Sequence, residues 1–218
     1  MPNGLIGKPP VGINKGMDGY LRKINSLPRS VNKLSVWDID DTLFTSDLKI
    51  LVIKNNQVVR SLSTSQFNTY RKKSGEEFDF SQFKDGKLFF HSASPLEANL
   101  KIAKQAIESK DTMMITLSAR SKTTDKNLFL KKFQKYGIDM DLSKSHSVFA
   151  GELSLPTAKA KAEVLDKCLS TNKFNTIYMY DDNKQNLNEF LKLQTKYKDV
   201  RFSAYMVNHT TGKISKVK

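Results

Sequence analysis

The chain has 218 residues, of which 39% are hydrophobic and 27% are charged, and its formal net charge is +14. This length allows one domain with a small insertion and a sizeable core, and no apolar run approaches the roughly 20 residues of a membrane span. The single cysteine, Cys168, excludes an internal disulfide, and with only three histidines it argues against a zinc site. The start of the chain lacks the charged-then-apolar pattern of a signal peptide, so we expect a cytoplasmic protein.

The positive charge favours a polyanionic partner, nucleic acid first, and nothing points to a membrane. Most of the excess is lysine, spread along the whole chain, whereas arginine, the better bidentate reader of phosphate, is scarce. A general lysine bias explains the charge nearly as well, so contact with nucleic acid stays one of two open alternatives.

Residues 1–30 are rich in glycine, proline and basic side chains and lack the apolar density of a folded segment. We expect them to form an extended, basic N-terminal arm that is solvated, lies on its own domain or runs along a nucleic-acid backbone. The folded domain would then span residues 31–218.

Residues 34–37 form a short apolar run that predicts a buried strand, and Asp38 stands where this strand ends. Alternate residues of an extended chain point to the same side, so Asp38 and Asp40 can face one small volume. Carboxylates about 5 Å apart repel by roughly 3 kcal/mol at an effective dielectric near 20, and a hard cation such as Mg²⁺ would offset this repulsion. The alternative is a solvated turn, which the apolar residues Leu43 and Phe44 disfavour.

Two β-prone runs, residues 48–54 and 57–62, are separated by a pair of asparagines, and this pattern predicts a β-hairpin. Residues 64–92 then mix aromatic with charged side chains. We expect residues 45–92 to form a small insertion whose aromatic side chains pack into a core of their own, although exposed rings among lysines can also stack on bases.

A helix start is predicted at Ser94, with Pro95 in the first helical position and Glu97 completing a capping box. Residues 112–117 then predict a buried strand that ends at Ser118.

A further helix is predicted to begin at Pro156, and Lys161 falls inside its apolar arc, whereas Lys159 falls on its polar face. A lysine on the buried side of a helix needs an anion to face, or must extend its ammonium group past the helix end into water. Lys161 is therefore the lysine of interest.

Residues 174–180 predict another buried strand, which ends in Asp181 and Asp182 and repeats the arrangement at Asp38. Strands that alternate with helices predict an α/β fold, with a parallel sheet, helices on both faces and a site at the carboxyl ends of the strands.

These features occur in the order of the four sequence motifs of the haloacid dehalogenase (HAD) superfamily, which residues 33–195 resemble. The four resembling stretches are Asp38-x-Asp40-x-Thr42, Leu117-Ser118-Ala119-Arg120, Lys161 and Asp181-Asp182. The resemblance implies a HAD-like Rossmannoid sheet, a β-hairpin flap and a small cap insertion after the first strand. Because dehalogenases of the superfamily lack the second aspartate, Asp40 indicates phosphoryl transfer.

The resemblance also implies roles for the motif residues. Asp38 would be the nucleophile and Asp40 the general acid/base. Ser118, with Thr116 as the alternative if the register is shifted, would bind the phosphate, and Lys161 would neutralise it. The expected substrate-binding residues are Thr42, Ser118, Ala119, Arg120 and Lys161. The expected Mg²⁺ ligands are Asp38, Asp40 through its carbonyl, and Asp182, with Asp181 as the second choice of the pair.

We therefore expect a Mg²⁺-dependent phosphatase that acts on nucleotides or nucleic-acid ends. The last strand and helix also resemble HAD domains predicted to act in RNA-end repair. Two alternatives stay open: a nucleic-acid-binding or structural protein that retained the scaffold, and a phosphotransferase whose acceptor is not water.

Overall fold

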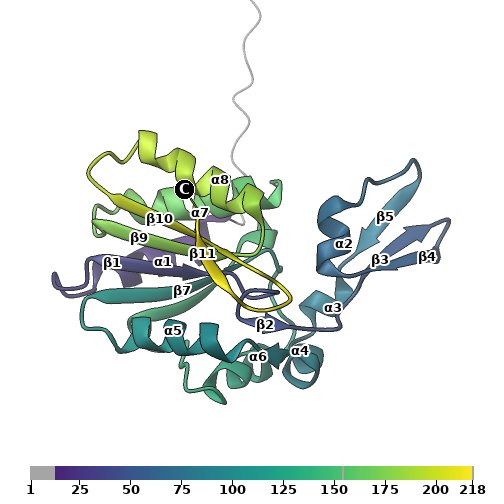
Figure 1. Ribbon diagram of the computed structural model, residues 1–218, viewed down its shortest axis with the longest axis horizontal. Helices are drawn as coiled ribbons and strands as arrows, with labels where there is room; N and C mark the ends of the chain where they lie inside the picture. Colours follow the sequence, from purple (N-terminus) through teal and green to yellow (C-terminus); the bar gives the residue numbers. More distant parts are fainter. Residues whose placement is uncertain (1–12, 154, 218) are drawn as a thin grey trace, which may run out of the picture.

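The computed structural model describes residues 13–153 and 155–217 (Figure 1). The strands of its central sheet are β1 (Lys33–Trp37), β7 (Thr112–Ser118), β8 (Ser145–Phe149), β9 (Thr176–Asp181), β10 (Arg201–Val207) and β11 (Ile214–Lys216). They lie in the order β11-β10-β9-β1-β7-β8. All neighbouring pairs are parallel except β10 and β11. The predicted α/β class with a mostly parallel sheet is confirmed.

Helices cover both faces of this sheet (Figure 1). One face packs against α1 (Ile13–Asn25), α7 (Thr157–Leu169) and α8 (Lys184–Lys192), and the other against α4 (Gly86–Ser92), α5 (Glu97–Glu108) and α6 (Lys126–Gln134). Two 3₁₀ turns, η1 (Ala150–Glu152) and η2 (Leu193–Thr195), complete the main body. None of the helices in the described part of the chain combines the length and apolar character needed to cross a bilayer.

The buried strand β1 divides its side chains between the two faces, as alternation in an extended chain requires. Leu34 and Val36 belong to the core beneath α1, α7 and α8, whereas Trp37 belongs to the core on the other face. Trp37 stacks on Tyr180 of β9 with ring centroids 3.8 Å apart, and Tyr180 stacks on Tyr205 of β10 at 4.7 Å. This aromatic row crosses three neighbouring strands close to their carboxyl ends and aligns them there.

The prediction of an extended arm over residues 1–30 is wrong for the part that the structure describes. Ile13–Asn25 form α1, and its side chains Tyr20 and Ile24 are buried in the main core. The segment after α1 is also held against the main body, because Lys173 Nζ donates a hydrogen bond of 2.7 Å to the Leu27 carbonyl. Apolar residues at helical spacing thus override the glycine and lysine around them. Residues 1–12 lie outside the described residues.

A second, three-stranded sheet is made of β3 (Ile50–Lys54), β4 (Gln57–Leu62) and β5 (Glu76–Asp79) in the order β4-β3-β5. The predicted hairpin is confirmed as β3 and β4. Its two turn residues, Asn55 and Asn56, have φ angles of 51° and 60°, the left-handed conformation that asparagine tolerates in a two-residue hairpin loop.

This sheet, together with α2 (Thr64–Thr69) and α3 (Ser81–Lys84), forms a unit that we call the small subdomain, residues 48–84 (Figure 1). It has a core of its own, as predicted, which consists of Leu48, Ile50, Val52, Leu62 and Phe83 with Phe67, Tyr70 and Phe78 packed against them. The expected insertion over residues 45–92 extends too far, because α4 packs on α6 and places Phe89 in the core of the main body.

The chain enters and leaves the small subdomain through a pair of short antiparallel strands, β2 (Phe44–Thr45) and β6 (Ser94–Pro95). The predicted serine cap at Ser94 is therefore wrong. The helix α5 begins at Glu97, and its N-cap residue, Leu96, makes no side-chain capping bond. Pairing with β2 uses the residues that would otherwise have capped the helix.

We predict that Ile24→Ala, which removes a fully buried side chain of α1, lowers the free energy of unfolding by about 2–4 kcal/mol. The matched control is Arg22→Ala, an exposed position of the same helix, which should change stability by less than about 0.5 kcal/mol. Chemical denaturation of the two variants measures both values. Equal, small effects would mean that α1 does not pack on the domain in solution.

Candidate functional site

The predicted site residues converge at the carboxyl ends of three adjacent strands. Asp38 follows β1, Ser118 is the last residue of β7, and Asp181 is the last residue of β9. The backbone N–H of Asp38 donates to the carbonyl of Tyr180 at 2.9 Å, which extends the pairing of β1 with β9 into the site. Acidic side chains distant in sequence are thereby fixed on one edge of the sheet.

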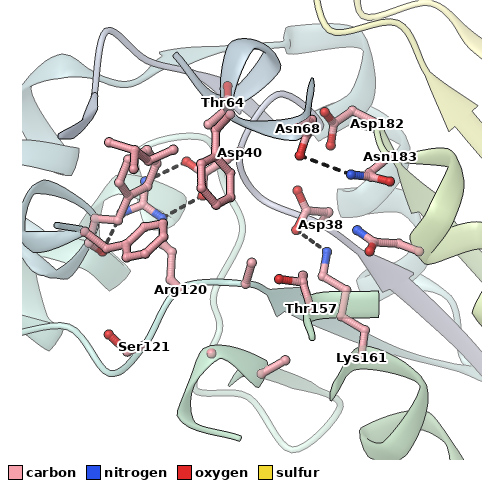
Figure 2. A pocket seen from close by; sticks show the side chains of 18 of the residues that line it. Asp38, Asp40, Thr64, Asn68, Arg120, Ser121, Thr157, Lys161, Asp182 and Asn183 are labelled. Carbon is pink, nitrogen blue, oxygen red and sulfur yellow. Dashed lines mark hydrogen bonds and ion pairs between the residues drawn. The ribbon is translucent and has the colours of Figure 1, made fainter. Parts of the chain in front are cut away.

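Lys161, near the start of α7, is the charged group at the centre of this edge (Figure 2). Its side chain is only 2% exposed, and its Nζ lies 2.6 Å from Asp38 Oδ1 and 2.7 Å from Asp181 Oδ2. The apolar stripe of α7 packs on the sheet and directs Lys161 inward, whereas Lys159 is exposed. The structure therefore brings Lys161, and not Lys159, to the acidic residues.

The two consecutive aspartates after β9 have different surroundings. Both oxygens of Asp181 are engaged: Oδ2 by Lys161, and Oδ1 by the backbone N–H of Asn183 at 2.9 Å and Nδ2 of Asn186 at 2.8 Å. Asp182, and not Asp181, lines the cavity next to Asp38. Asp181 thus orients Lys161 and the start of α8, while Asp182 presents its carboxylate to the cavity.

Three carboxylates form a group that could hold a metal ion. One oxygen from each of Asp38, Asp181 and Asp182 lies within 4.8 Å of the others. When all three are ionised, the single charge of Lys161 leaves two negative charges uncompensated in a buried place. A divalent cation would balance them, and a donor set of carboxylate oxygens fits a hard cation.

Burial and crowding shift the protonation of this group. Burial raises the pKa of Asp38 to about 7, against the opposing effect of Lys161, and repulsion from Asp181 and Asp40 adds to the rise. Burial raises the pKa of Asp182 to about 9, with further repulsion from Asp38 and Asp181. Burial disfavours the charge of Lys161, but its ion pairs with Asp181 and Asp38 prevail and raise its pKa. Protons therefore offset part of the negative charge when no cation is present.

Asp40 lies on the other side of the cavity, paired with Arg120 (Figure 2). Nε and Nη2 of Arg120 donate to the two oxygens of Asp40 at 2.7 and 2.6 Å, and Nη1 donates to the carbonyl of Phe83 at 3.0 Å. The guanidinium also lies over the rings of Phe83 and Phe89, at 5.1 and 4.5 Å. Arg120, expected to bind substrate, here holds Asp40 and the small subdomain.

Three other predicted residues, Ser118, Thr116 and Thr42, do not line the cavity. The hydroxyl of Ser118 accepts a hydrogen bond of 3.1 Å from the backbone N–H of Arg120, which shapes the loop whose residues Ala119 and Arg120 line the cavity. The hydroxyl of Thr116 donates a hydrogen bond of 3.0 Å to the hydroxyl of Ser147. Thr42 is fully buried, and its carbonyl accepts from Nδ2 of Asn99 at 2.8 Å. Its hydroxyl is the one buried side-chain polar atom without a partner among the described residues.

The small subdomain lies against this edge, and residues of the small subdomain and of the main body line an open cavity of about 420 Å³. The hydroxyl of Thr64, at the start of α2, donates to the carboxylate of Asp41, and Nδ2 of Asn183 donates to Oδ1 of Asn68 at 3.2 Å. Sequence reasoning did not identify Asp41, Thr64 or Asn68. The capping box from Ser63 to Gln66 could have located α2, but no sequence pattern indicates its partners across the cavity.

Comparisons of the chain with protein-family models, with curated proteins and with solved structures gave no match.

We predict that Asp182→Asn makes stability less dependent on pH in the absence of metal. In the wild type, the folded state raises the pKa of Asp182 from 3.8 to about 9 and so binds a proton that the unfolded chain has lost. The associated stability is complete at acid pH and disappears as the pH rises through the folded pKa. Unfolding of the wild type in chelator should therefore become easier from about pH 5 to about pH 9, and less so in the variant.

The same pair of proteins tests metal binding. Mg²⁺ should raise the melting temperature of the wild type by several degrees at alkaline pH and raise that of Asp182→Asn much less. The control is Asp199→Asn, which removes an exposed carboxylate outside the site and should respond like the wild type. An equal response of wild type and Asp182→Asn would contradict a cation site at Asp182.

Proposed function

We propose that this protein is a Mg²⁺-dependent phosphomonoester hydrolase that forms an aspartyl-phosphate on Asp38, as the resemblance to the HAD superfamily implies. The observation that supports this most strongly is the position of Asp38. It lies at a strand end beside the buried Lys161, and both residues line one cavity together with Asp40 and Asp182. A carboxylate nucleophile, a cationic partner and an acid/base group are the parts that this chemistry requires.

The residues present fit Mg²⁺. The group of Asp38, Asp181 and Asp182 supplies oxygen ligands only, and its uncompensated charge matches that of a divalent ion. Asp38 and Asp182 are the residues that would hold the ion directly, because both oxygens of Asp181 already accept hydrogen bonds. When bound, Mg²⁺ neutralises negative charge on the phosphate and on the acids, so that the two can approach each other.

Asp38 and Lys161 provide the first step. The pair at 2.6 Å fixes the orientation of the carboxylate and leaves Asp38 Oδ2 outside the ion pair, available to attack phosphorus in line. Lys161 stays charged because Asp181 and Asp38 raise its pKa. It can therefore stabilise the charge on the equatorial oxygens during transfer.

Asp40 provides the proton transfers in this proposal. It protonates the leaving oxygen as the phosphate moves to Asp38, and as a carboxylate it then activates the water that hydrolyses the aspartyl-phosphate. Each Asp40 oxygen accepts one N–H from Arg120 and retains a second lone pair for a proton. Arg120 thereby holds Asp40 in a fixed orientation towards the cavity.

Nucleotides or nucleic-acid ends are the proposed substrates. The net charge of +14 favours approach of a polyanion, and a cavity of about 420 Å³ suits one small group rather than an extended duplex. The phosphate of such a substrate would lie between Asp38 and the loop of Ser118, Ala119 and Arg120.

We predict that Asp38→Asn lowers the turnover of a phosphomonoester in the presence of Mg²⁺ by at least about 10³-fold, because an amide cannot form the aspartyl-phosphate. Steady-state hydrolysis of a generic aryl phosphate measures this loss, and the melting temperature reports whether the variant is folded. The exposed control Asp199→Asn should keep wild-type turnover. If Asp38→Asn is folded and retains its turnover, Asp38 is not the nucleophile.

A separate prediction concerns Arg120→Lys. A lysine cannot bridge both oxygens of Asp40, so we expect kcat to fall about 10- to 100-fold with little change in KM. The same change in an Asp40→Asn background should cost nothing further, because Arg120 acts through Asp40. Arg201→Lys, the same change at an exposed arginine outside the cavity, is the control and should preserve kcat. A rise in KM alone would instead make Arg120 a substrate contact.

A further inference from the structure

The cavity has two chemically different parts. Its polar part consists of Asp38, Asp40, Lys161 and Asp182, which the proposed phosphate chemistry uses. The rest of the lining includes six large apolar side chains: Ile50, Phe67, Phe80, Phe83, Leu153 and Leu155. Phosphate and water need only the polar part, so the apolar part is available for the group that the phosphate is attached to.

Two of these apolar side chains are exposed. Phe80, between β5 and α3, is 39% exposed, and Leu155, just before α7, is 48% exposed. A single exposed apolar residue needs no explanation. Here two of them come from segments far apart in the sequence and line the same cavity, next to a buried charged site. Both therefore present apolar, water-accessible area to the cavity that Asp38 and Lys161 also line.

Polar contacts hold this surface at a fixed place relative to the acids. Arg120 joins Asp40 to the carbonyl of Phe83, which lies three residues after Phe80. The bonds from Thr64 to Asp41 and from Asn183 to Asn68 attach α2, which carries Phe67. Phe67 in turn packs edge-to-face on Phe80 with centroids 5.4 Å apart. These contacts therefore fix the position of Phe80 relative to Asp40 and Asp41.

We propose that the cavity selects phosphate monoesters whose leaving group carries a flat aromatic ring, of the size of one nucleoside, and that Phe80 and Leu155 contact this ring. The inference rests on the proposed function and specifies the substrate of that same site. Aromatic and aliphatic side chains bind the faces of planar rings without regard to their polar edges. The volume of about 420 Å³ lies within the usual range of small-ligand pockets.

The test compares two ligands that share a phosphate and differ by the ring, AMP and ribose 5-phosphate. Binding is measured by calorimetry with Mg²⁺ and the full chain carrying Asp38→Asn, so that no turnover intervenes. AMP should bind at least about tenfold more tightly than ribose 5-phosphate. Adding Phe80→Ala or Leu155→Ala should remove most of this preference without changing the affinity for ribose 5-phosphate.

The matched control is Leu142→Ala, which truncates a leucine of similar exposure, 45%, that does not line the cavity. It should leave the preference unchanged. The ring can belong to a free nucleotide or to the end of a nucleic acid. A single-stranded oligonucleotide with a terminal phosphate tests the second case, and Phe80→Ala should weaken its binding too. Equal affinities for AMP and ribose 5-phosphate, no binding of AMP, or a preference that survives both cavity variants would overturn the proposal. Failure of the proposed function gives a different result, namely a wild type that prefers AMP and does not hydrolyse it.

Discussion

The ion pairs of Lys161 are the constraint on which the rest of the site depends. One buried ammonium group binds the carboxylates that follow β1 and end β9, so it joins two strands of the sheet to α7. Such a charge is tolerated in the interior only when it is paired and hydrogen-bonded, and both conditions hold here. The lysine also sets the charge of the site. It compensates one of the three carboxylates and leaves two negative charges, which a divalent cation can balance.

The position of the small subdomain and the orientation of Asp40 both depend on the side chain of Arg120. The guanidinium of Arg120 binds Asp40 and the Phe83 carbonyl at once, and the arginine side chain is only 2% exposed. A movement of the small subdomain away from the main body would therefore disturb Asp40 as well as the apolar lining of the cavity. In the proposed mechanism, proton transfer is thus linked to the position of the segment that forms one wall of the cavity.

Local periodicity made much of this structure predictable. The buried strand β1, the asparagine turn of the hairpin and the inward direction of Lys161 all follow from patterns within one segment. Two predictions were wrong because tertiary packing overrode a local signal. The glycines of α1 suggested an extended arm where a helix packs on the domain, and Ser94, expected to cap a helix, pairs with β2 instead. The partner of Arg120 lies 80 residues away in the sequence, and no pattern within either segment indicates such a pair.

The aromatic row across β1, β9 and β10 has a practical consequence. Trp37 is the one tryptophan of the chain, it directly precedes Asp38, and it stacks on Tyr180, which directly precedes Asp181. The indole is fully buried and its Nε1 is hydrogen-bonded to Ser35, so it is shielded from bulk solvent. Its fluorescence is an intrinsic optical probe of the electric field at the acidic edge, and arrival of a cation or an anion there can be followed without attaching a dye.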